Sequence, residues 1–138
     1  RDRLRSRGLG DVYKRQSQVF DCGICSYANQ IKERVLGVSH ETLEALGAVS
    51  RETAAQMAAG VRKLAQADIG VSTTGIAGPD GGTDEKPVGL VYVGVDSENY
   101  STVLECRLSR GYRDERELIR YLASSHALRL ALTAARKA

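Results

Sequence analysis

The sequence predicts an α/β fold in which helices cover both faces of a central sheet, a three-layer α/β/α arrangement. The strongest observation is the run VGLVYVGV at 88–95, which is apolar at nearly every position, as expected of a strand covered on both faces. Strand-like and helix-like stretches also alternate along the chain. With 138 residues, 42% hydrophobic and 27% charged, the chain has the size and composition of one globular domain.

The first regular segments are expected to be one strand and short helices. Residues 19–27 are expected to form the strand. Asn29 can act as the N-cap of a helix that runs through Leu36, and Gly37 is a typical residue to end it. Residues 38–49 would then hold a helical turn and a loop.

A longer helix is expected to begin at Ser50, which can cap it, with Glu52 in the positive first turn. The β-branched run 69–74 predicts a strand that leads directly into the glycine-rich segment 75–82. Apolar residues recurring at helical spacing define the buried face of the helix: Ala54, Met57, Ala58, Val61, Leu64 and Ala65.

The C-terminal part is expected to hold an edge strand at 100–108 and a long terminal helix. Asp114, with Glu117 three residues later, resembles a capping box at the start of this helix. Aromatic residues make up only 5% of the chain, so the core should be built from Ala, Val, Ile and Leu. The apolar positions of the terminal helix include Leu118, Ile119, Leu122, Ala123, Leu128 and Leu132.

Residues 1–16, RDRLRSRGLGDVYKRQ, differ in character from the rest of the chain. Arginines recur there without an apolar period, and two glycines interrupt any helix. We interpret this segment as a non-native or disordered basic leader, the translated remnant of a sequencing adapter; a natural basic tail is the alternative. The domain itself is then expected to span 17–138.

Charge and composition argue against several classes of partner. Residues 1–16 carry six basic side chains against two acidic ones, so the remainder is close to neutral although the whole chain has a net charge of +3. A nucleic-acid-binding body would carry the basic patch itself. No stretch approaches the roughly 18 apolar residues of a membrane span. Three cysteines cannot form a disulfide framework. We therefore expect a cytoplasmic protein with no nucleic-acid or membrane partner.

The segment GIAGPDGG at 75–82 is the first candidate for chemistry. Its glycines follow a strand, where backbone N–H groups can converge on an anion and where open α/β sheets bind ligands. It matches neither the Walker A pattern nor the dinucleotide fingerprint. From composition alone, a tight structural turn and a ligand cradle are equally good interpretations.

Tyr27 and Lys32 flank the expected junction between strand and helix. A lysine in a partly dry cleft can have its pKa lowered enough to act as a base for a serine nucleophile. A surface lysine on a first helical turn is the simpler reading of the spacing alone. Cys22 and Cys25 have zinc-knuckle spacing without a second ligand pair, so no metal site is expected. Arg116 and Arg120 are expected on a solvated helix face.

Three ordered motifs resemble one family. SYANQIKERVLGV at 26–38, GAVS at 47–50 and TGIAGPDGGTDEKPVGLVYV at 74–93 are similar to segments of the CinA C-terminal domain, which also occurs alone as PncC. The similarity runs from about Ser17 to the end of the chain. It implies hydrolysis of the carboxamide of nicotinamide mononucleotide, a small-molecule nucleotide, to nicotinate mononucleotide and ammonia, with no cofactor. It also favours a homodimer.

The resemblance also implies roles for particular residues. Lys32 and Tyr27 match the family's assisting lysine and tyrosine, and the glycine loop is similar to its substrate cradle. We expect the three to converge on one cleft. The implied nucleophile is a serine in a Ser-Cys-Thr-Gly-Gly motif that this chain lacks, which implies an N-terminally truncated, inactive domain. A non-catalytic nucleotide-binding or assembly domain is the alternative. The implied substrate-binding residues are Thr74, Gly75, Gly78, Gly81, Gly82 and Thr83.

Overall fold

The central element is a three-stranded antiparallel sheet, seen in a computed structural model that describes residues 18–137. Its strands are β1 (Ile69–Gly75), β2 (Leu90–Ser97) and β3 (Ser101–Arg107), and their spatial order repeats their order in the chain. In the register, Val71 lies opposite Val95 of β2, and Val93 lies opposite Leu104 of β3. The strand predicted at 88–95 is therefore the central strand, although it begins and ends two residues later than predicted.

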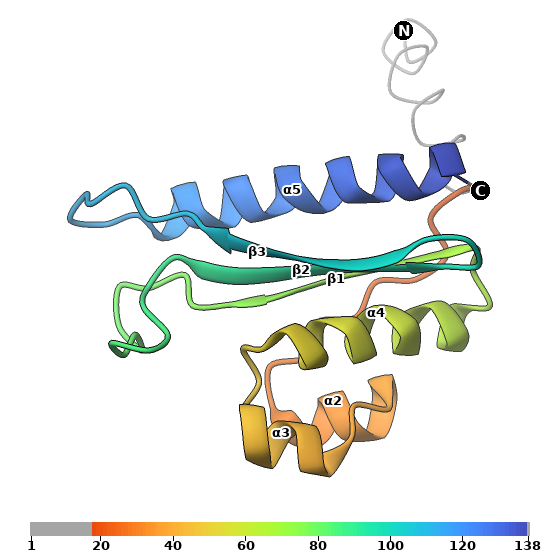
Figure 1. Ribbon diagram of the computed structural model, residues 1–138, viewed down its shortest axis with the longest axis horizontal. Coiled ribbons are helices and arrows are strands. Elements are labelled where there is room, and N and C mark those ends of the chain that lie inside the picture. Colours follow the sequence, from red (N-terminus) through yellow and green to blue (C-terminus); the bar gives the residue numbers. More distant parts are fainter. Residues whose placement is uncertain (1–17, 138) are drawn as a thin grey trace, which may run out of the picture.

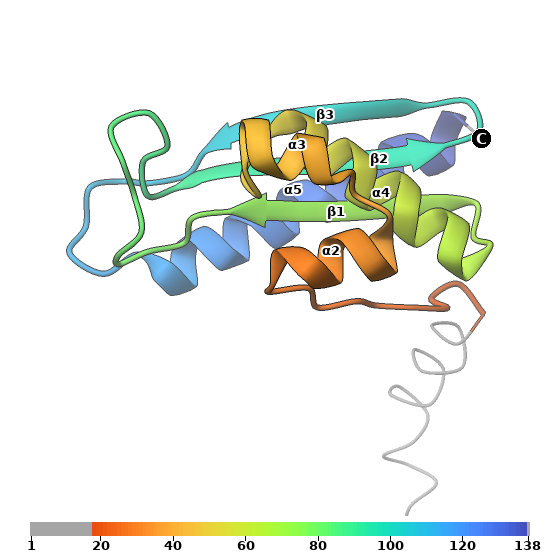
Figure 2. The ribbon, with the colours of Figure 1, turned by 90° about the horizontal axis from the view of Figure 1, so that it is seen from below.

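Helices cover both faces of this sheet, which confirms the three-layer α/β prediction. Helix α5 (Arg116–Lys137) lies on one face and α4 (Arg51–Ala65) on the other (Figure 1). The short helices α2 (Asn29–Leu36) and α3 (His40–Leu46) pack on the outer side of α4 (Figure 2). No helix among residues 18–137 combines the length and the apolar character needed to cross a membrane.

Two apolar clusters hold these layers together. The first joins the sheet to α5, and Ile119, only 1% exposed, lies at its centre. The second joins α2 and α3 to α4. Strand β2 is buried along almost its whole length because α4 and α5 cover it from opposite sides. The buried members are Val91, Val93, Cys106, Leu108, Ile119 and Ala123 in the first cluster and Leu36, Val38, Leu43 and Met57 in the second.

Helix α4 approaches its neighbours very closely. Its N-terminus is capped as predicted, because the Ser50 hydroxyl accepts the backbone N–H of Thr53. A Cβ on Gly70 of β1 would lie 2.1 Å from the Ala58 carbonyl oxygen of α4. Small residues therefore let the helix backbone rest almost directly on the sheet.

The start of α5 differs in detail from the predicted capping box. Asp114 does accept the backbone N–H of Arg116, but Glu117 pairs with Arg120 on the surface and does not reach back. The buried Glu115 makes the more extensive contacts at this end, since its carboxylate accepts from the Ser109 hydroxyl and the Arg110 backbone N–H.

Three predictions about packing are wrong. Residues 19–27 form no strand in the described structure: Val19 lies in a turn, and 20–27 belong to no helix or strand. On α4, Leu64 is 53% exposed and not part of the buried face. On α5, Leu128 and Leu132 are 72% and 51% exposed. The prediction for residues 1–16 lies outside the described residues.

Candidate functional site

Lys32 is the buried titratable group of α2. Its side chain is held below the surface, and the residue is only 5% exposed. Its Nζ donates to the backbone carbonyl oxygens of Ser26 and Tyr27, each at 3.0 Å. Burial lowers the pKa of Lys32 from its usual value because the charged ammonium loses hydration.

Either protonation state of the Lys32 amine can make the two carbonyl contacts. An ammonium group has three N–H donors and no acceptor. A neutral amine has two N–H bonds, which the two carbonyls of Ser26 and Tyr27 can satisfy, and one lone pair that remains available. The local geometry of Lys32 can therefore support proton acceptance. The nearby Ser26 Oγ is buried and has no hydrogen-bond partner among the described residues.

Among the described contacts, the backbone carbonyl oxygen of Tyr27 is the only part of this residue that contacts Lys32. The residue is 98% exposed, so its phenol faces solvent. The assisting role expected for this phenol stays a prediction.

Thr74 and Thr83 use their hydroxyls to hold the local backbone. Thr74 Oγ1 donates to the Ala48 carbonyl oxygen at 2.6 Å and ties the end of β1 to the segment before α4. Thr83 Oγ1 accepts the backbone N–H of Lys86 at 3.0 Å and closes a tight turn. The Lys86 side chain in turn donates to the Leu46 carbonyl at the end of α3.

The glycines of the 75–82 loop have clear structural reasons. Gly78 and Gly81 adopt φ values of 78° and 90°, a left-handed region that favours glycine. A Cβ on Gly82 would lie 2.8 Å from the Val88 backbone nitrogen, and one on Gly75 would lie 2.7 Å from the Leu90 carbonyl oxygen. These contacts support the structural-turn interpretation, and they leave the ligand-cradle interpretation open.

Arg116 ties this loop to α5. Its guanidinium donates to the Gly78 carbonyl oxygen at 2.8 Å, a contact that joins residues 38 positions apart. The sequence placed Arg116 on a solvated face, and nothing in its spacing indicated a loop contact. The buried Glu115 beside it has a lowered pKa, chiefly because the Ser109 hydroxyl donates to its carboxylate.

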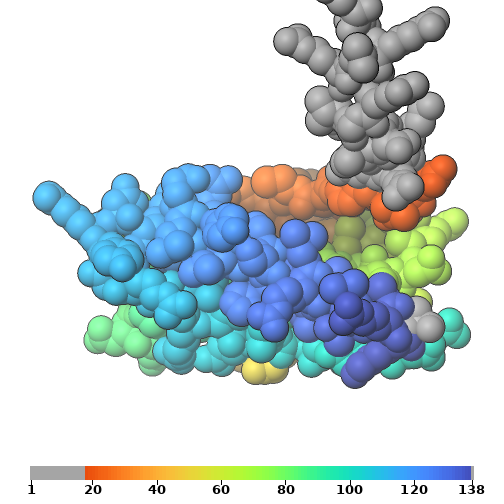
Figure 3. Space-filling model, turned by 90° about the horizontal axis from the view of Figure 1, so that it is seen from above, coloured from red at the N-terminus to blue at the C-terminus, as the bar shows by residue number. Residues whose placement is uncertain are grey.

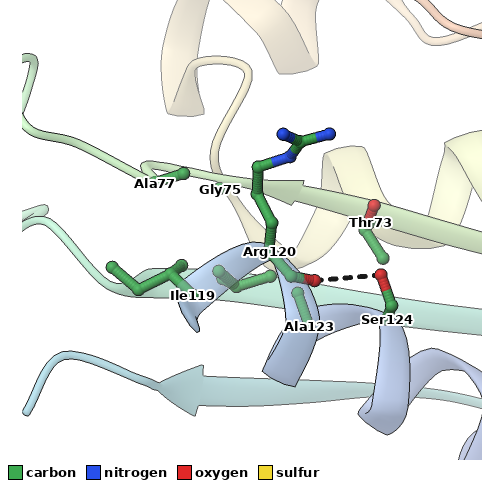
Figure 4. Close-up of a pocket in the computed structure, with 8 residues that line it drawn as sticks. Thr73, Gly75, Ala77, Ile119, Arg120, Ala123 and Ser124 are labelled. Carbon is green, nitrogen blue, oxygen red and sulfur yellow. Dashed lines mark hydrogen bonds between the residues drawn. The ribbon is translucent and has the colours of Figure 1, made fainter. Parts of the chain in front are cut away.

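A small cavity of about 290 Å³ lies between β1 and the first turns of α5 (Figure 4). The Arg120 side chain extends from α5 beside it, and Ser124 Oγ donates back to the Arg120 carbonyl oxygen at 2.9 Å. Sequence reasoning had placed none of these residues at a cavity except the adjoining Gly75. The lining residues are Thr73, Gly75, Ala77, Val91, Ile119, Arg120, Ala123 and Ser124.

The loop that follows β1 lies at one end of the long axis, on the left in Figures 1 and 2, whereas α2, which carries Lys32, lies nearer the middle. Lys32 does not line the small cavity that Gly75 borders. Their convergence on one cleft therefore stays a prediction. Among residues 18–137, no group of three or more His, Cys, Asp or Glu side chains could hold a metal ion.

The covered sheet and the glycine loop together define an α/β domain. At the end of β1 it carries a loop that is held by the Thr83–Lys86 turn and by the contact from Arg116 to Gly78. Residues 13–135 match the family model described as the CinA C-terminal domain. The chain belongs to this family.

Relatives and solved structures agree with this assignment. The chain is 54% identical over 112 residues to a protein named as competence-damage inducible in Thermoanaerobacter pseudethanolicus, covering 81% of this chain and 26% of that protein. It is 51% identical over 112 residues to a CinA-like protein of Desulfovibrio desulfuricans, again covering 81% of this chain and 26% of the relative. The chain thus spans about a quarter of the length of these curated relatives.

Among solved structures, the competence/damage inducible protein CihA from Agrobacterium tumefaciens superposes with a TM-score of 0.73 at 41% identity. The match covers 79% of this chain and 65% of that protein. A CinA superfamily protein from Escherichia coli superposes with a TM-score of 0.69 at 33% identity, covering 77% of this chain and 59% of its own.

Proposed function

We propose that this domain belongs to an amidohydrolase that converts nicotinamide mononucleotide to nicotinate mononucleotide and ammonia. The observation that carries the proposal is the buried Lys32, with its lowered pKa and its two carbonyl contacts. Amide hydrolysis through an acyl-enzyme requires a base that takes the proton of a hydroxyl nucleophile. A neutral Lys32 can accept that proton through its lone pair, which the two N–H contacts to the Ser26 and Tyr27 carbonyls leave free.

The glycine loop is the proposed place for the substrate phosphate. Its backbone N–H groups are the donors that such an anion would use. The anchor from Arg116 to the Gly78 carbonyl would hold the loop in place before substrate binds. Because such a loop is already ordered, no conformational entropy is lost in ordering it when substrate binds, and the affinity is higher.

The 138-residue chain is proposed to be inactive because it lacks the Ser-Cys-Thr-Gly-Gly motif. Losing the nucleophile of a serine hydrolase costs on the order of a millionfold in rate. We therefore expect no ammonia release from this chain. A version that carries the family's Ser-Cys-Thr-Gly-Gly segment ahead of residue 17 is expected to be active.

The decisive test is made on that longer, active version. Lys32→Ala should lower kcat by about a hundredfold to ten-thousandfold, the usual contribution of a general base. Lys32→Arg should be equally poor, since arginine keeps its charge and cannot accept a proton. Lys63→Ala, at an exposed lysine of α4, is the matched control and should leave kcat unchanged.

The pH profile supplies a second criterion. The rate should rise with pH through the folded pKa of Lys32, which lies below the usual lysine value, because the base must be neutral to act. Full activity in Lys32→Ala would remove the lysine from the mechanism. Turnover by the 138-residue chain itself would place the nucleophile elsewhere. Nucleotide binding without turnover by the longer version would support a non-catalytic binding domain instead.

A further inference from the structure

The short segment between α3 and α4 is held from several sides by side chains. Three successive backbone carbonyl oxygens, at residues 46–48, each accept a hydrogen bond from a side chain. The donors lie at the start of α4, at the end of β1 and in the loop before β2, so the segment joins three parts of the domain. The contacts run from Lys86 Nζ to Leu46, from Ser50 Oγ and Thr53 Oγ1 to Gly47 at 3.2 and 2.9 Å, and from Thr74 Oγ1 to Ala48 at 2.6 Å.

Lys86 makes the contact of longest range in this group, since it lies 40 residues from Leu46. Its backbone is fixed by a turn in which the Thr83 N–H donates to the Lys86 carbonyl oxygen at 2.9 Å. The residue is half-buried, and a Cβ on Gly47 would lie 3.3 Å from Nζ. An ammonium group beside the last carbonyls of a helix is electrostatically favourable. Lys86 is therefore an anchored side chain and not a freely solvated one.

The loop between β1 and β2 is thereby held on both sides of the sheet. On one side Arg116 of α5 donates to the Gly78 carbonyl oxygen, and on the other side Lys86 reaches the end of α3 (Figure 1). Figure 3 shows this end of the molecule from the α5 side, with the green loop beside the light-blue segment that leads into α5. The loop thus bridges the two helical layers through one cationic side chain on each side.

Helices α2 and α3 form one unit, so a contact to α3 also fixes α2. At the end of α2, the Val38 N–H donates to the Lys32 carbonyl oxygen at 3.1 Å, and both helices share one apolar cluster with α4. The Gln56 amide of α4 accepts the Ser39 N–H at 2.8 Å and donates to Thr42 Oγ1 at 2.9 Å. The tie from the glycine loop to α3 therefore also fixes the loop relative to α2, which carries the proposed base.

We propose that Lys86 is a positioning residue of the amidase site, which sets the distance between the glycine loop and Lys32. This role rests on the proposed function, in which the loop binds the substrate phosphate and Lys32 activates the nucleophile. A nucleotide held by its phosphate presents its carboxamide correctly only if the loop and the base keep a fixed separation. A displacement of about 1 Å can cost roughly a hundredfold in rate. Lys86 acts through the Leu46 carbonyl and does not contact the substrate.

The test compares variants of the longer version that carries the Ser-Cys-Thr-Gly-Gly segment. Lys86→Met keeps an unbranched side chain but removes the donor, so kcat should fall about tenfold to a hundredfold. KM should stay within about threefold, because the loop that binds the phosphate is still closed by its own turn and by Arg116. Lys86→Arg should recover most of kcat, since a guanidinium also donates to a carbonyl oxygen. Lys63→Met, at an exposed lysine of α4, is the matched control and should change neither value.

Two further measurements separate positioning from a general loss of structure. The pH at which the rate rises should be the same in Lys86→Met as in the parent, because Lys32 and its carbonyl contacts are intact. In the 138-residue chain, Lys86→Met should speed amide exchange at Gly47, whose N–H closes the last turn of α3. Exchange at Ile76 and Gly89, whose N–H groups close the base of the loop, should be unchanged.

Different results would overturn the proposal in different ways. An unchanged kcat in Lys86→Met would remove Lys86 from the site and leave the proposed function intact. A raised KM with little change in kcat would show that Lys86 contacts the substrate directly. If Lys86→Arg does not recover kcat, or if exchange becomes faster throughout the chain, the role of Lys86 is purely structural. If the longer version with Lys86 intact releases no ammonia, the proposed function itself fails, and this role fails with it.

Discussion

Gly60 is the position where the packing of α2 on α4 leaves least room. A Cβ added there would lie 1.8 Å from the Leu36 carbonyl oxygen, a backbone atom at the end of α2. An ordinary carbon–oxygen contact is about 3.3 Å, so α2 would have to move away by about 1.5 Å. We therefore expect Gly60→Ala to lower the stability of the domain.

The magnitude follows from two opposing effects. Alanine is favoured over glycine inside a helix by about 1 kcal/mol. Overpacking against a well-packed neighbour costs about 1–3 kcal/mol. Because the clash is with backbone and not with a flexible side chain, we place the cost at the upper end and expect a net loss of about 1–2 kcal/mol in the free energy of unfolding.

Urea unfolding followed by circular dichroism measures this loss. With a slope of about 1–2 kcal/mol per molar urea, the midpoint should fall by roughly 1 M. Ala59→Gly, at the exposed neighbouring position, calibrates the propensity effect and should cost about 1 kcal/mol. A Gly60→Ala variant that unfolds at the same or a higher urea concentration would refute the argument and show that α2 can move aside without a loss of stability.

Two further predictions concern the start of α5. Glu115→Gln should lower stability at neutral pH, because the carboxylate that accepts from Ser109 is replaced by a neutral amide. Because the pKa of Glu115 is lowered in the folded state, its charged form contributes stability above the unfolded pKa, and this contribution is lost as pH falls through the folded pKa. The urea midpoints of the two proteins should therefore converge in acid. A constant difference between them would contradict this. Arg116→Ala should speed amide exchange in the loop that holds Gly78 without affecting β2, whereas Arg113→Ala, at an exposed position, should leave the loop unchanged. Equal exchange in both variants would show that the guanidinium contact does not order the loop.

Most of the fold could be predicted because local patterns and tertiary packing agree. The run 88–95 is apolar at nearly every position, and the two faces of β2 are indeed covered. Ser50 combines a capping hydroxyl with a following helical period, so that helix start was also predictable. The antiparallel direction of the strands was not predictable, because an apolar run does not indicate whether the neighbouring strands run parallel or antiparallel to it.

The errors arise where a residue's environment depends on chain elsewhere. Residues 19–27 have the composition of a strand, but a strand also needs a partner edge, which composition does not reveal. Leu128 and Leu132 fit the apolar period of α5, yet they are exposed because they line an open groove beside β1. For the site, the burial of Lys32 could not be read from its spacing, since it depends on how the segment before α2 folds back over the amine.

The agreement between strand order and chain order has a consequence for the sequence of folding events. Each strand pairs with the next one along the chain, and the β2–β3 hairpin is closed by Ser97 and Tyr100 in a short turn. Pairing between sequence neighbours closes small loops and is therefore fast. The β2–β3 hairpin should therefore form first, and β1 should join it later because the connection from β1 to β2 is longer than the turn between β2 and β3.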